Sequence, residues 1–120
     1  MYLNNWNSLD QMKADFWPGY SDAEKYNGEL DGANVLLASY GTPNYEGHAF
    51  VLFERSGKLY EVNGSHCSCY GLEGQWKPEV TAIEVLRHRL EHGKLGAEEY
   101  DENPFSAELR TVLDSLTANA

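Results

Sequence analysis

The chain has little positive charge and no long apolar segment, and each shortage excludes a class of protein. Nine Lys and Arg face nineteen Asp and Glu among 120 residues, so the formal net charge is −10. A surface of this sign repels phosphates, which argues against direct binding to nucleic acid or to an anionic membrane. No apolar run in the sequence approaches the roughly 18 residues that a membrane-spanning helix needs.

Cysteine is also scarce, and the two that occur, Cys67 and Cys69, are separated by one residue. In an extended segment their Cα atoms would be about 6.5–7 Å apart, at the upper limit of disulfide geometry. We therefore expect reduced thiols and no disulfide. The first residues lack the basic region and the apolar core of a secretory signal, which together with the thiols favours a cytoplasmic protein.

Three helices are predicted from capping residues and from apolar residues at helical spacing. The first follows a capping box at Ser8–Gln11 and stops before Pro18. The second opens with a capping box at Thr81–Glu84 and runs to about His92. The third starts at Asn103–Pro104, with the asparagine as cap. The residues expected on the buried faces are Leu9, Met12 and Phe16; Ile83, Leu86 and Leu90; and Phe105, Leu109, Val112, Leu113 and Leu116.

Strands are predicted in the middle of the chain. Val35–Ala38 is a short apolar run between glycines, as in a buried strand, and His48–Phe53 and Leu59–Asn63 flank a two-residue turn at Ser56–Gly57. Both faces of the strand at His48–Phe53 are apolar, so we expect it to be central. The pattern predicts one α+β domain over residues 1–120, with an antiparallel sheet of about three to four strands flanked by helices.

The acidic residues are clustered. The chain from Glu98 onward carries a net charge of −5, half of the total, and a second acidic patch extends from Asp22 to Asp31. An acidic face suits a basic protein partner, including one whose groove normally holds nucleic acid. The alternative is that the charge only keeps a small protein soluble.

A structural zinc ion is a second hypothesis, because thiolates and imidazoles together form tetrahedral zinc sites. The candidate ligands are Cys67 and Cys69 with His66, completed by His48 or by the pair His88 and His92. The Cys-x-Cys spacing differs from the usual Cys-x2–4-Cys knuckle. We expect His88 and His92 to lie on a solvated helix face, with Glu84 beside His88, and otherwise expect no cofactor.

A third hypothesis is a cysteine hydrolase. The histidine that opens the strand at His48 resembles the strand-opening histidine of papain-like peptidoglycan hydrolases of the NlpC/P60 and CHAP kinds. In those families the nucleophilic cysteine precedes the histidine, whereas here none does. Cys67 would have to act from downstream, with His48 or His66 as base and Glu61 or Asn63 orienting it.

The segment from Gly64 to Trp76, GSHCSCYGLEGQW, together with the hairpin before it resembles a group of small proteins carried by phages and prophages. The resemblance covers about residues 33–92 and implies no particular activity, fold or site. Small acidic phage proteins often bind and inhibit a host protein, some by imitating nucleic acid. Our leading hypothesis is a non-enzymatic protein that binds a basic host protein through Glu98, Glu99, Asp101, Glu102, Glu108 and Trp76.

Overall fold

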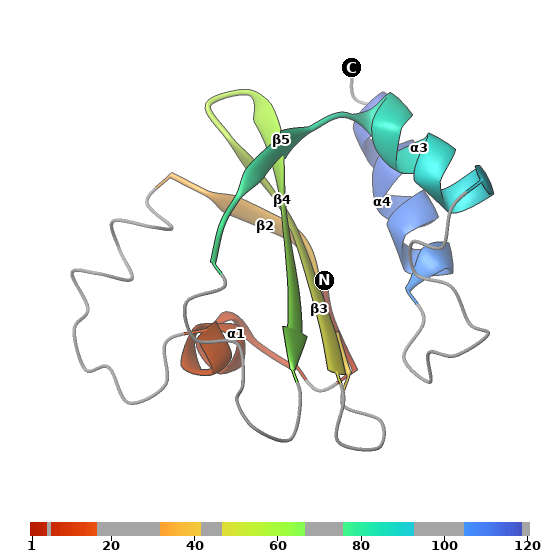
Figure 1. The fold of residues 1–120 in the computed structure, drawn as a ribbon. Coiled ribbons are helices and arrows are strands. Elements are labelled where there is room, and N and C mark those ends of the chain that lie inside the picture. Colours follow the sequence, from red (N-terminus) through yellow and green to blue (C-terminus); the bar gives the residue numbers. More distant parts are fainter. Residues whose placement is uncertain (5, 17–31, 42–46, 67–75, 93–104, 119–120) are drawn as a thin grey trace.

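The computed structural model describes residues 1–4, 6–16, 32–41, 47–66, 76–92 and 105–118. Five strands and three helices lie within these residues (Figure 1). In chain order they are β1 (Tyr2–Asn4), α1 (Leu9–Phe16), β2 (Asn34–Gly41), β3 (Gly47–Arg55), β4 (Lys58–His66), β5 (Glu79–Thr81), α3 (Ile83–His92) and α4 (Ser106–Ala118).

The strands form one mixed sheet in the order β1-β2-β3-β4-β5. β1 runs parallel to β2, and every other neighbouring pair is antiparallel. The α+β class is confirmed, but the sheet has more strands than expected, and one pairing is parallel. The two strands that the sequence did not predict, β1 and β5, have three residues each, which is too short to show an alternating pattern.

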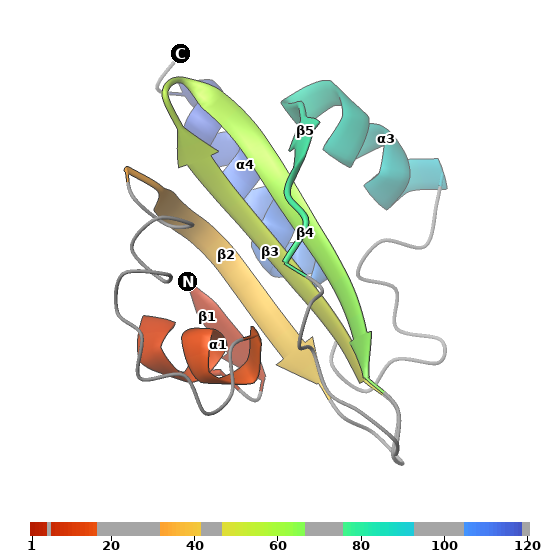
Figure 2. The same cartoon turned by 60° about the vertical axis from the view of Figure 1, so that its left-hand side comes forward.

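Helices cover both faces of the sheet. α1 lies on one face, and α3 and α4 lie on the other (Figures 1 and 2). Along β3, Phe50 and Leu52 pack toward α3 and α4, whereas Val51 and Phe53 pack toward α1. All four side chains are at most 2% exposed, which confirms that this strand is central. Burial of each such side chain contributes about 1.5–3 kcal/mol.

A bulge in β2 changes which face its side chains join. The register with β3 shifts between Val35 and Leu37, so Leu36 is an extra residue. Val35 packs on the α1 face, whereas Leu36 and Leu37 both pack on the face of α3 and α4. Because both faces of β2 pack against helices, the apolar run from Val35 onward is continuous and not alternating.

The predicted cap of α1 is present. The Gln11 amide donates to Ser8 Oγ at 3.3 Å, and the Gln11 side chain accepts from the amide of Asn7. This differs from the usual capping box only in that the side chain reaches one residue further back. On the same side, the indole of Trp6 is fully buried and donates to Asp15 Oδ2 at 2.5 Å.

The two-residue turn between β3 and β4 is confirmed. Ser56 and Gly57 both have positive φ, 55° and 78°, as a type I′ turn requires. Glycine adopts this conformation freely, whereas serine at the first position is strained.

The capping prediction for the second helix is wrong at its first residue. Thr81 is the last residue of β5, and α3 begins at Ile83 with the Leu86 amide donating to the Ala82 carbonyl at 3.0 Å. Because Thr81 belongs to the strand, the helix starts at Ile83, one residue later than a cap at Thr81 implies. In α4 the Leu109 amide donates to the Phe105 carbonyl at 2.9 Å, while the predicted cap at Asn103–Pro104 lies outside the described residues.

Candidate functional site

The negative charge is divided unevenly between the described elements and the rest of the chain. The described residues carry nine acidic and seven basic side chains, a formal charge of −2. The remaining residues carry ten acidic and two basic side chains, a formal charge of −8. The described sheet and helices form a nearly neutral scaffold, and most of the net charge belongs to residues outside the described ranges.

The segment between α3 and α4 contains most of the predicted partner-binding residues and lies outside the described residues. The two helices that it joins lie on the same face of the sheet (Figure 2). An ion pair between Arg87 and Asp114, at 2.9 Å, connects them. The predicted residues in this segment are Glu98, Glu99, Asp101 and Glu102.

The other two predicted partner-binding residues, Glu108 and Trp76, are described. Glu108 lies in the first turn of α4 and is half-buried. Trp76 is also half-buried, and its ring packs edge-on to Phe16 at 5.0 Å and stacks on Phe53 at 5.7 Å. The core therefore uses much of the indole surface.

The most buried charged group that the structure describes is Glu61, on β4 facing α3. Its side chain is 7% exposed, and Arg89 of α3 donates through Nη1 to Oε1 at 2.6 Å and to Oε2 at 2.8 Å. Asn63 Nδ2 also donates to Oε1, at 2.8 Å. This pair joins α3 to the sheet.

Burial and the polar neighbours of Glu61 have opposite effects on its pKa. Burial alone would raise the pKa, because it penalises the charged form. Hydrogen bonds from Arg89 and Asn63, the nearby Thr81 hydroxyl and the charge of Arg89 together outweigh burial and hold the pKa of Glu61 below its ordinary value. A carboxyl that stays ionised in this way serves as a fixed anion and not as a general acid.

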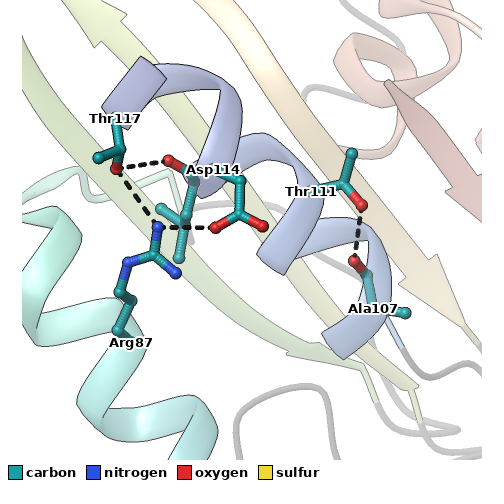
Figure 3. A network of polar contacts seen from close by, with 6 residues as sticks. Arg87, Ala107, Thr111, Asp114 and Thr117 are labelled. Atoms are coloured by element: carbon teal, nitrogen blue, oxygen red, sulfur yellow. Dashed lines mark hydrogen bonds and ion pairs between the residues drawn. The ribbon is translucent and has the colours of Figure 1, made fainter. Parts of the chain in front are cut away.

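Further arginines make contacts within the fold. Arg87 Nη2 donates to Asp114 Oδ1 at 2.9 Å and to Thr117 Oγ1 at 3.3 Å, linking α3 to α4 (Figure 3). Arg110 Nη2 donates to the Leu90 carbonyl at 3.4 Å. The guanidinium of Arg55 lies 5.4 Å from the ring centroid of Tyr60, in cation–π contact. Like Arg89, these arginines hold the scaffold together.

The candidate zinc ligands are only partly described. The β3–β4 register places His48 opposite Ser65 and His66 opposite Gly47, so the backbones of the two histidines are close. The His48 side chain is exposed. Cys67 and Cys69 lie outside the described residues, and within the described ranges no three His, Cys, Asp or Glu side chains converge on a metal position. The zinc hypothesis thus stays a prediction.

The residues suggested to orient a hydrolase histidine belong to a different cluster. Glu61 lies opposite Leu52, four residues along β3 from His48, which corresponds to about 13 Å. Asn63 is nearer to His48 but donates to Glu61. Both side chains serve the Arg89 contact, while the proposed nucleophile, Cys67, lies outside the described residues.

The sequence did not reveal the pair of Glu61 and Arg89. A signal for this pair existed, because the two-residue turn at Ser56–Gly57 places Glu61 opposite Leu52, on a strand that is apolar on both faces. Nothing in the sequence indicated which basic residue would meet Glu61. The spacing of His88 and His92 was recognised as that of two residues on one helix face, and the structure places their ring centroids 4.8 Å apart.

Comparison of the chain with models of known protein families, with curated protein sequences and with solved structures finds no significant match. Among the helices in the described ranges, none is long and apolar enough to cross a membrane.

Proposed function

We propose that the protein is a non-enzymatic interaction protein that binds a basic protein partner through the acidic segments between its helices and strands. The segment with Glu98, Glu99, Asp101 and Glu102 is the main binding element. The single observation that carries the proposal is the division of charge, with −8 of the net −10 outside a nearly neutral scaffold.

The ion pairs of the scaffold support the same proposal. Arg87 and Arg89 have carboxylate partners within the fold, at 2.9 and 2.6 Å, so they are not free to neutralise the acidic segments. A concentration of one charge sign steers association with a partner of opposite sign and speeds the encounter. The resemblance of residues 33–92 to small phage and prophage proteins suggests a basic host protein as the partner. The proposed effect is inhibition, in which this protein occupies the partner's binding site for nucleic acid.

The first experiment is capture from a lysate of the candidate host at about 50 mM and about 500 mM salt, where screening differs strongly. Three proteins are compared. One is the wild type, and the second carries E98Q, E99Q, D101N and E102Q. The third is a matched control that loses the same charge from exposed acids of the described elements, with D10N, E79Q, E84Q and E91Q.

The proposal expects the wild type and the control to retain the same basic protein at low salt, and the segment variant to retain at least about tenfold less. Retention that does not depend on salt or on the variant contradicts the electrostatic mechanism. Duplex DNA added as a competitor tests the mimicry separately. A partner that binds DNA and this protein at the same time would exclude mimicry of nucleic acid, while the proposal that the acidic segment binds a basic protein would stand.

A further inference from the structure

The exposed face of α3 carries two histidines one helical turn apart, His88 and His92, and both are exposed to solvent. The two arginines of the helix are directed elsewhere, Arg87 to Asp114 on α4 and Arg89 to Glu61 on the sheet. These contacts fix the orientation of α3 and keep its cationic groups in ion pairs. The histidine face is thus a fixed surface of the fold.

The separation of the two imidazole rings is compatible with both binding one metal ion. Their ring centroids are 4.8 Å apart. A metal ion bound at about 2.0–2.1 Å from an imidazole nitrogen lies about 3.2 Å from that ring's centroid. If the two ring centroids subtend a right angle at the ion, they are about 4.5 Å apart. If they subtend the tetrahedral angle, they are about 5.2 Å apart. The observed distance falls between these values, closer to the right angle.

We propose that His88 and His92 form a two-imidazole chelate for one divalent transition-metal ion of the class that prefers nitrogen ligands, with Ni²⁺ as the probe. Imidazole nitrogen is a preferred ligand of nickel, copper and zinc, and the two rings lie 4.8 Å apart on one helix face. The site does not include Cys67 or Cys69, and so it differs from the zinc site suggested by the sequence.

The charges around the pair favour a cation. Glu91 Oε2 lies 3.8 Å from His92 Nε2, and Glu84 stands one helical turn before His88, exposed like the histidines. No third ligand converges with the two rings among the described residues, so the remaining coordination positions belong to water or to a donor from another molecule. A site of this kind binds with moderate affinity and keeps open positions.

The experiment is a titration of the full chain with Ni²⁺, followed by the intensities of its backbone amide signals in NMR spectra. Ni²⁺ is paramagnetic, so signals near the bound ion broaden first. The proposal expects the earliest losses at residues 84–92. His88→Gln and His92→Gln should each weaken binding by at least about tenfold, because the second imidazole acts as an intramolecular ligand.

His48→Gln is the matched control, since His48 is an exposed histidine on the sheet, and it should leave the affinity unchanged. All three substitutions replace exposed side chains, so the fold should survive each of them. Three results would overturn the proposal. They are first losses at residues 66–69, equal affinities of the wild type and the α3 variants, and no binding at about 1 mM Ni²⁺, a concentration that even millimolar affinity would register.

Discussion

Removing Arg89 should destabilise the fold more than removing the charge of its partner. Arg89→Met leaves the Glu61 carboxylate, with a side chain 7% exposed, without its cation. Breaking a buried pair in this way costs about 3–5 kcal/mol. Because the Arg89 side chain is itself 36% exposed, water supplies part of the lost solvation, and we expect about 2–3 kcal/mol.

Glu61→Gln removes the negative charge of the pair and keeps nearly the shape of the glutamate side chain. The guanidinium of Arg89 keeps an amide oxygen as acceptor and, being a third exposed, can also reach water. We expect a loss of only about 1 kcal/mol, the value of a typical hydrogen bond. The difference between the two variants thus measures the cost of an uncompensated buried carboxylate.

The pH dependence separates this mechanism from a loss of packing. In the wild type the pKa of Glu61 is lowered by folding, so its contribution to stability is present above the ordinary carboxyl pKa and lost as pH falls through the lowered value. In Arg89→Met the raising effect of burial dominates. The carboxyl then gains a proton more readily when folded, and the variant approaches the wild type in stability as pH falls below about 5.

The assay is urea unfolding at about pH 7 and about pH 4, with the free energy of unfolding taken from the transition midpoint and slope. The reasoning is refuted if Arg89→Met costs no more than Glu61→Gln at neutral pH. A gap between Arg89→Met and the wild type that stays constant across the pH range would also refute it, because packing alone would then explain the loss.

The same unfolding assay tests further predictions. Ser56→Asn should raise stability by about 0.5 kcal/mol, because asparagine tolerates positive φ better, and no gain would argue against the turn. Gly57→Ala should cost about 1 kcal/mol from backbone strain alone, since a Cβ there meets nothing within 4 Å. Leu109→Ala in the core should cost about 3 kcal/mol, whereas Val85→Ala, at 49% exposed, should cost under about 0.5 kcal/mol, and equal losses would contradict the assigned layers.

The sequence was sufficient for the elements whose apolar pattern is long. The hairpin of β3 and β4, with its turn at Ser56–Gly57, was predicted because both strands are long and the turn residues are specific. α4 was predicted from a stripe that the structure packs on the sheet. By contrast, β1 and β5 depend on pairing with β2 and β4, and three residues carry no periodicity that could reveal them.

The contacts of Glu61 and Arg89 were less predictable, because they too depend on residues that are distant in the sequence. Glu61 and Arg89 are 28 residues apart and meet only because α3 folds back over β4. The spacing of His88 and His92 could be seen in the sequence, whereas the partners of Arg87 and Arg89 on the same helix are a tertiary property. The acidic clusters were visible from the sequence alone, whereas the near neutrality of the described sheet and helices needed the structure.

The central claim is that the acidic residues of the segment between α3 and α4 bind a basic partner. The most direct measurement is the dissociation constant for the captured partner at several salt concentrations, for the wild type, the segment variant and the matched control. The account predicts a steep weakening with salt in the wild type and the control, and a clearly shallower dependence when Glu98, Glu99, Asp101 and Glu102 are neutralised. Equal salt dependences in all three proteins would contradict it.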